Sequence, residues 1–173
     1  MLIVITMIGI MAAIVVPRMR VSSKTRVRQA AVQLVKDIEQ TRTRALTTRS
    51  RTRIAFVAGS NNYTGYLDIN RDTVFAQSTA ERDSLRTFRT RALAEGVVYG
   101  RSTATDIPTL PGAGNITFAN TRVEFDTRGL TTPFGSSGVV YLTHPSDVTA
   151  IAAVTVTAGG SIRRWVFQGG TWR

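Results

Sequence analysis

The sequence begins with MLIVITMIGIMAAIVVP, residues 1–17, an apolar segment without any charged side chain and with Thr6 as its only hydroxyl. Arg18 and Arg20 follow directly. With a rise of ~1.5 Å per residue, a helix of this length spans roughly 25 Å, slightly less than the ~30 Å hydrocarbon core of a bilayer. We therefore expect the segment to insert into a membrane or to pack against copies of itself.

Two other interpretations of this segment fit the residues less well. A secretory signal peptide has a basic region before its apolar stretch and a polar mature sequence after its cleavage site. Here no charge precedes the segment, and Ala12-Ala13 is followed by further apolar residues. A buried helix of a soluble domain would be interrupted by polar residues every three or four positions, whereas only Thr6 interrupts this one.

A second helical pattern follows, in a strongly basic part of the chain. Residues 18–53 contain 11 of the 22 Lys and Arg residues but only two acidic ones, Asp37 and Glu39. Apolar residues recur there at helical spacing, at Val27, Ala31, Leu34, Val35, Ile38, Ala45 and Leu46. We expect one long helix over residues 1–50, kinked near Pro17, because a proline within a helix removes a backbone hydrogen bond.

From Arg53 onward the pattern changes to alternation with a period of two, which indicates strands. We expect strands, separated by Gly- and Asn-containing turns, at residues 53–57, 63–69, 85–92, 97–99, 116–118, 122–125, 138–142, 152–157 and 162–167. Pro, Gly and Thr dominate residues 102–115, which predicts a loop. The fold class is therefore α+β, with a helix packed on an antiparallel sheet. The three expected regions are an apolar helix (1–20), a basic amphipathic helix (21–52) and a β-rich domain (53–173). The chain has no cysteine, so no disulfide or thiolate metal site can form.

The N-terminal residues resemble a known family. Leu2 to Ile5, Met7 to Ile14 and Pro17 are similar to the N-terminal helix of type IV pilins and type II secretion pseudopilins. Short motifs farther along the chain resemble the GspH/FimT branch: Ala30-Ala31, Leu34 to Ile38, Arg44-Ala45, Arg53 to Phe56, Phe125 to Gly129, Val154 to Val156 and Gly160 to Arg163. The resemblance implies a filament and membrane helix that includes Leu2, Ile3, Ile8, Gly9, Ile10, Ile14 and Pro17.

The resemblance also implies a location and partners. Such a subunit sits in the bacterial inner membrane with its globular domain in the periplasm, and then joins other pilins in a pilus or pseudopilus. Family members carry a leader ending in glycine, followed by a methylated phenylalanine and a glutamate, all before the segment that matches Leu2. None of these precedes Leu2, so either the true start lies upstream, which we favour, or the gene has lost its processing site.

Asp68, Asn70 and Asp72 form the D-x-N-x-D spacing that opens an EF-hand calcium loop. That pattern requires glycine next and a carboxylate at the twelfth position, where this chain has Thr73 and Thr79. Glu81 or Asp83 could complete an oxygen site for Ca²⁺. The alternative, which we favour, is a polar turn whose side chains cap their own backbone, so no cofactor is expected.

The single histidine, His144, lies near Asp147 and could orient Ser136 or Ser137 as a nucleophile. The surrounding sequence has neither a nucleophile elbow nor a marked oxyanion hole. We therefore expect no enzyme activity and no small-molecule substrate.

After Asp147 the chain has no acidic residue, while Arg163, Arg164 and Arg173 lie near Trp165 and Trp172. Guanidinium groups pair with phosphates and indoles can stack on bases, which makes DNA binding a second hypothesis. Some members of the GspH/FimT branch bind DNA through an arginine-bearing C-terminal strand and tail in natural transformation. Arg163 is the position of this chain that matches their arginines. In the alternative interpretation of this segment, its apolar residues pack inward and its arginines are solvated.

For the whole chain we expect a minor pilin or pseudopilin that acts in filament assembly or at the filament tip. The second functional hypothesis is a DNA-binding pilus-tip subunit for natural transformation.

Overall fold

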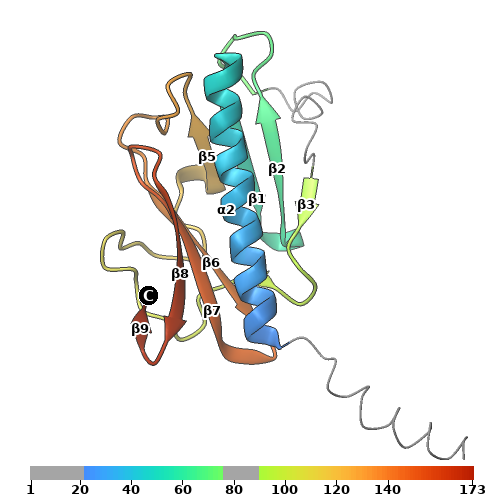
Figure 1. Ribbon diagram of the computed structural model, residues 1–173, viewed down its shortest axis with the longest axis vertical. Coiled ribbons are helices and arrows are strands. Elements are labelled where there is room, and N and C mark those ends of the chain that lie inside the picture. Colours follow the sequence, from blue (N-terminus) through green and yellow to red (C-terminus); the bar gives the residue numbers. More distant parts are fainter. Residues whose placement is uncertain (1–21, 76–89) are drawn as a thin grey trace, which may run out of the picture.

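The computed structural model describes residues 22–75 and 90–173, in which one long helix lies against two antiparallel sheets (Figure 1). The helix, α2, spans Ser23–Thr48. The strands are β1 (Thr52–Val57), β2 (Asn62–Leu67), β3 (Thr90–Ala92), β4 (Val98–Tyr99), β5 (Arg122–Phe125), β6 (Gly138–His144), β7 (Asp147–Val156), β8 (Ile162–Gln168) and β9 (Thr171–Trp172). Short 3₁₀ helices occupy Ala58–Ser60 and Ala119–Thr121.

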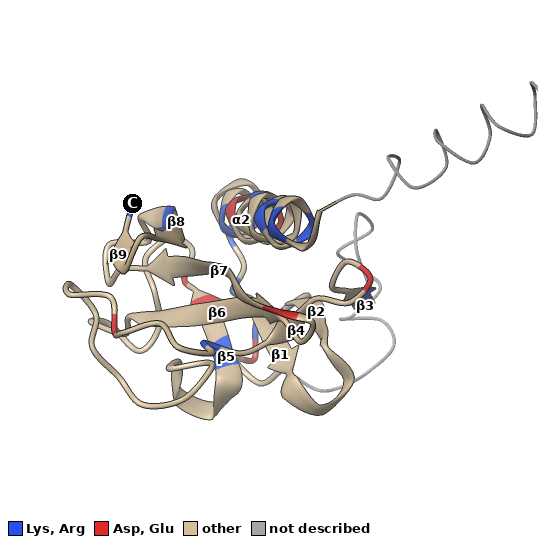
Figure 2. Ribbon diagram, turned by 90° about the horizontal axis from the view of Figure 1, so that it is seen from below, with Lys and Arg blue, Asp and Glu red and all other residues tan. Residues whose placement is uncertain are grey.

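The strands form a four-stranded sheet in the order β3-β2-β1-β5 and a five-stranded sheet in the order β4-β6-β7-β8-β9. Every strand pair is antiparallel, which confirms the α+β class. Figure 2 shows α2 above β7, with β6 and then β1 and β5 farther from the helix. The two sheets were not separated in the sequence-based prediction, because alternation along one strand says nothing of which strand it pairs with.

Several predicted strands differ from those in the structure. Residues 116–118 form no strand, and Ile116 makes only a single bridge to Val140. β3 covers the last three residues of the predicted 85–92 strand, and the rest lies outside the described residues. β9 was missed because two residues carry no readable periodicity.

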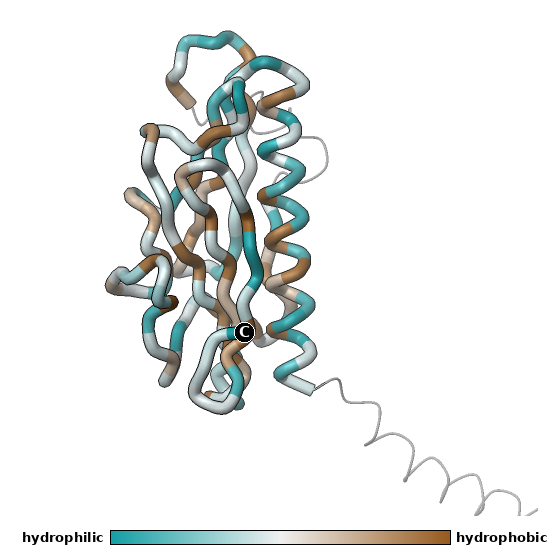
Figure 3. Tube along the Cα trace, turned by 60° about the vertical axis from the view of Figure 1, so that its left-hand side comes forward, coloured by the Kyte–Doolittle hydropathy of each residue, from teal (hydrophilic) through white to brown (hydrophobic). Residues whose placement is uncertain are grey.

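α2 forms because its apolar residues return to one face every three or four positions. Figure 3 shows these hydrophobic residues recurring between hydrophilic ones along the helix. Its buried side chains pack mainly on β7, with β8, β1 and β6 beside it. The helix ends where Arg49 adopts a left-handed conformation, with φ of 49°. The core between helix and sheets includes Val27, Ala31, Leu34, Ile38, Ile54, Phe56, Phe125, Val140, Leu142 and Val154.

The apolar segment, residues 1–17, lies outside the described residues. So do Arg18 and Arg20 and the bend expected near Pro17. In residues 22–75 and 90–173, no helix combines the length and the apolarity that a membrane crossing requires.

Candidate functional site

The C-terminal hairpin carries the arginines and tryptophans that the sequence singled out. β8 and β9 are joined by Gly169 and Gly170, whose φ values of 59° and 81° form a two-residue turn that favours glycine. β9 is short: the main-chain N–H and C=O of Val166 both bond to Arg173, at 2.8 and 3.1 Å. Arg163, Arg164 and Arg173 are exposed.

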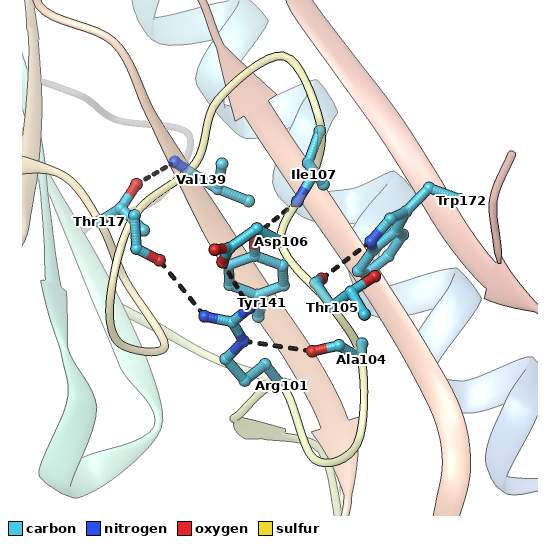
Figure 4. Close-up of polar contacts among 10 residues, drawn as sticks. Arg101, Ala104, Thr105, Asp106, Ile107, Thr117, Val139, Tyr141 and Trp172 are labelled. Carbon is cyan, nitrogen blue, oxygen red and sulfur yellow. Dashed lines mark hydrogen bonds and ion pairs between the residues drawn. The ribbon is translucent and has the colours of Figure 1, made fainter. Parts of the chain in front are cut away.

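Trp165 and Trp172 are partly buried and belong to a second, smaller core with Ile107, Val139 and Tyr141. The Trp165 indole N–H donates to Thr155 Oγ1 at 3.0 Å. The Trp172 indole N–H donates to the Thr105 carbonyl at 3.0 Å, as Figure 4 shows. The Trp172 ring also lies 5.8 Å from Tyr141, between ring centroids. Both indoles therefore have packing and hydrogen-bond partners within the chain, as in the alternative interpretation of this segment.

The loop after β4 closes over this second core. The Arg101 guanidinium donates to the carbonyls of Ala104 and Gly112, at 3.4 and 3.3 Å, and pairs with Asp106 (Figure 4). It also lies 5.0 Å from the centroid of the Tyr141 ring. The Pro/Gly/Thr-rich stretch predicted as a loop is thus held to the five-stranded sheet by one arginine and by Trp172.

The D-x-N-x-D residues form a turn after β2 in which the three side chains have different environments. Asp68 is 1% exposed and accepts from the Thr73 N–H at 3.1 Å, whereas Asn70 and Asp72 are exposed. Asp72 accepts from the Asn70 side chain at 2.9 Å and from the Val74 N–H at 2.8 Å. Glu81 and Asp83 lie outside the described residues. Among the residues that are described, no three acidic, histidine or cysteine side chains form a metal-binding group.

His144 and the candidate serines lie at opposite ends of β6. Ser137 precedes the first residue of this strand and His144 is its last residue, so ~20 Å of extended chain separates them. His144 Nδ1 instead lies 2.8 Å from Ser146 Oγ, and Asp147 accepts from Thr149. The structure therefore does not bring the suspected triad together.

The turn Phe125 to Gly129 is organised around the Asp126 carboxylate. Its Oδ1 accepts from the N–H groups of Arg128 and Leu130, at 2.8 and 2.9 Å, and its Oδ2 accepts from the Arg128 guanidinium at 3.0 Å. Burial would raise the pKa of this carboxyl, but these donors outweigh it and hold the pKa below its ordinary value. The sequence motif therefore encodes a self-capped turn.

We expect Asp126 to make stability depend on pH in the acid range. Because its folded pKa is depressed, its stabilisation is complete above the unfolded pKa of ~3.9 and is lost as the pH falls through the folded value. Urea denaturation at several pH values should show a smaller acid-side loss of stability for Asp126→Asn than for the parent chain. Glu39→Gln removes an exposed carboxylate and should leave the parent profile unchanged; identical profiles for the parent and Asp126→Asn would contradict the prediction.

Solved structures with this architecture were found. The type IV minor pilin FimU of Pseudomonas aeruginosa aligns with a TM-score of 0.52 and 10% sequence identity, over 84% of this chain and 96% of that chain. The minor pseudopilin EpsH from the type II secretion system of Vibrio cholerae aligns with a TM-score of 0.53 and 10% identity, over 84% of this chain and 99% of that chain. The chain has a GspH/FimT-like pilin fold. No protein-family model and no curated protein matches the sequence.

The pilin fold here contains a buried polar cluster that the sequence analysis missed. Asp37 lies on the apolar face of α2 and is 2% exposed. Its carboxylate accepts from the Tyr63 hydroxyl at 2.5 Å, from the Gln33 amide at 3.0 Å, and from Arg91 at 3.1 Å. The signal was present in the sequence, since an aspartate between Leu34 and Ile38 interrupts an apolar stripe, but its partners come from β2 and β3.

Burial raises the pKa of the Tyr63 hydroxyl far above its ordinary value, and the hydrogen bond to Asp37 adds to the shift. Tyr63 therefore stays protonated and acts as a donor. The cluster ties α2 to two strands of the four-stranded sheet, including the edge strand β3.

The residues expected to form the filament helix of this pilin fold are outside the described residues: Leu2, Ile3, Ile8, Gly9, Ile10, Ile14 and Pro17. Their role rests on their apolar character and on the family resemblance.

Proposed function

We propose that this chain is a minor pilin or pseudopilin, a subunit that acts in the assembly or at the tip of a type IV pilus or type II secretion pseudopilus. The observation that carries the proposal is the pilin fold itself, in which one long helix lies on antiparallel sheets and follows an apolar segment. FimU and EpsH, which share this fold, are a minor pilin and a minor pseudopilin.

The arrangement suits such a subunit physically. α2 uses its apolar face for the chain's own sheets. We propose that the apolar residues 1–17 make contacts with other subunits or with lipid. Burying that segment among copies of similar helices, or in a bilayer, removes apolar surface from water. In the proposed life cycle it first anchors the subunit in the inner membrane, with the globular domain in the periplasm, and later packs in the filament.

The proposal is a structural role rather than catalysis. Within the described residues, the His144 and serine pair is separated by the length of β6, and FimU and EpsH are filament components by name. The DNA-uptake alternative gains no support from the hairpin, because both indoles have partners inside the chain. Secretion and piliation remain equal alternatives within the proposal.

Deleting the gene in its own bacterium and complementing it tests the proposal. We expect the deletion to reduce either surface pili, recovered by shearing, or the export of secreted enzymes. The full-length chain should restore the lost phenotype and appear in the inner-membrane fraction.

Ile10→Asp is the decisive variant, because an unpaired carboxylate within a packed apolar helix is costly. It should fail to complement although the globular domain is unchanged. Ile69→Asp is the matched control, since Ile69 is 52% exposed on a surface turn, and it should complement. Normal piliation and normal secretion in the deletion strain, or full complementation by Ile10→Asp, would refute the proposal.

A further inference from the structure

β8 has an open edge over the half of the strand that β9 does not cover. β9 pairs only with Phe167 and Gln168, and its last main-chain bonds reach Val166 from Arg173. Main-chain groups of successive residues in a strand point to opposite edges. Since the N–H and C=O of Val166 face β9, those of Arg164 and Ile162 face the same edge, where no hydrogen-bond partner exists within the described part of the chain.

This edge is positively charged. Arg163 and Arg164 belong to β8 and are exposed, and the exposed Arg173 directly follows β9. None of these three guanidinium groups has a hydrogen-bond or ion-pair partner in residues 22–75 and 90–173. No acidic residue follows Asp147 in the sequence. In Figure 2 the ribbon is coloured for Lys and Arg at β8 and at several places along α2.

A groove lies over one face of the β7–β8 pair, between these strands and the loop at Thr109 and Leu110. It has a volume of about 340 Å³ and is lined by Thr109, Leu110, Thr155, Thr157, Ser161, Arg163 and Trp165. Alternate side chains of a strand added next to β8 would point toward this groove, because side chains alternate between the two faces of a sheet. The lining of the groove is mainly apolar and also holds the Arg163 guanidinium, so it suits short apolar side chains with a carboxylate close by.

Charge decides which strand fits. A second copy of this chain, paired edge to edge through β8, would bring Arg163 and Arg164 against their own equivalents, and basic side chains on edge strands prevent such self-pairing. The same arginines attract carboxylates. Nucleic acid could also pair with the guanidinium groups, but it offers no row of amide N–H and C=O groups to match the open edge, and the indoles are already packed.

We propose that the open edge of β8, from Ile162 to Trp165, is a docking site for an extended acidic segment of a partner protein, which adds to the five-stranded sheet as a further strand. The main chain of Ile162 and Arg164 would supply the pairing, and Arg163, Arg164 and Arg173 would select carboxylates. This is the β-strand addition mode of peptide recognition. The site does not depend on whether the chain enters a pilus or a pseudopilus.

A synthetic peptide that alternates Glu with Val and Thr is the probe, added to the full chain in a detergent with neutral head groups. Amide hydrogen exchange is the readout, because only strand pairing protects particular main-chain groups. We expect the Ile162 and Arg164 amides to exchange readily in the free protein and to become protected when the peptide saturates. The same peptide methylated on its backbone nitrogens keeps its charge but has no main-chain N–H groups to donate. It should therefore not protect the Ile162 and Arg164 amides.

The variant Arg163→Gln/Arg164→Gln should weaken peptide binding on the order of tenfold, because two complementary charges are lost at the site. Arg44→Gln/Arg49→Gln removes the same charge from exposed positions on and after α2 and should bind as the parent does. Three results would overturn the proposal: no protection at saturating peptide, equal binding of the methylated peptide, or arginine-dependent binding of duplex DNA in place of the peptide.

Discussion

Asp37→Ala is expected to lower the free energy of unfolding by about 2–4 kcal/mol. The substitution removes the acceptor that the buried Tyr63 hydroxyl, the Gln33 amide and Arg91 share. In the unfolded chain such a donor is hydrogen-bonded to water. Buried without an acceptor, it costs its full desolvation free energy, which lowers the free energy of unfolding. The Arg91 side chain is about one third exposed and can turn partly toward water, which keeps the expected loss below that of a fully buried ion pair.

Urea denaturation of the full chain, followed by tryptophan fluorescence, measures this effect. Tyr63→Phe is the informative companion, because it removes one donor and leaves Asp37 bonded to Gln33 and Arg91. We expect it to cost only ~1 kcal/mol, the net value of an ordinary hydrogen bond. If Asp37→Ala were no more destabilising than Tyr63→Phe, the carboxylate would not be the centre of the cluster.

Leu34→Ala should destabilise the fold by roughly 2–5 kcal/mol, the range for deleting a buried leucine side chain. Leu34 is fully buried where α2 meets the sheets, so the substitution leaves a cavity in the main core. The neighbouring strands are fixed by their own hydrogen bonds and can close that cavity only in part. Thermal and urea denaturation should both show the loss.

The control for this prediction is on the same helix. Leu46 is 44% exposed, and Leu46→Ala makes the same chemical change without opening a buried cavity. We expect it to cost less than ~1 kcal/mol, because apolar side chains contribute in proportion to the area they bury. Equal losses at the two positions would mean that α2 does not pack on the sheets through the face described here.

Periodicity alone gave much of the fold. The apolar spacing from Val27 to Leu46 predicted α2, and alternation predicted most of the strands, because a helix or strand must turn one face to the core. β5 and β8 were placed within a residue of their bounds, whereas β7, the longest strand, begins at Asp147, five residues before the predicted start. The short β9 was missed, and residues 116–118 looked apolar enough for a strand but pair only at one bridge.

The candidate sites show the limit of sequence reasoning more sharply. Trp165 and Trp172 have the same chemistry whether they are buried or displayed, and only the position of Thr155, Thr105 and Tyr141 shows that the chain itself occupies them. In the sequence, Asp37 is only one of two acidic residues in a basic helix. Its partners Tyr63 and Arg91 belong to β2 and β3, so only the folded structure shows that its carboxylate is buried and paired. The open edge of β8 depends on where β9 stops, which no residue type reveals.

The sequence by itself determined the apolar segment of residues 1–17, the helix, the strand-rich domain and the basic stretches, because these follow from composition and from spacing along the chain. The tertiary structure decided the two sheets, the second core under the C-terminal hairpin, the partners of Asp37 and the unpaired main chain at Ile162 and Arg164. The physical reason is that hydrogen bonds between strands and contacts between side chains join residues far apart in the sequence. Their geometry is set only when the whole core packs.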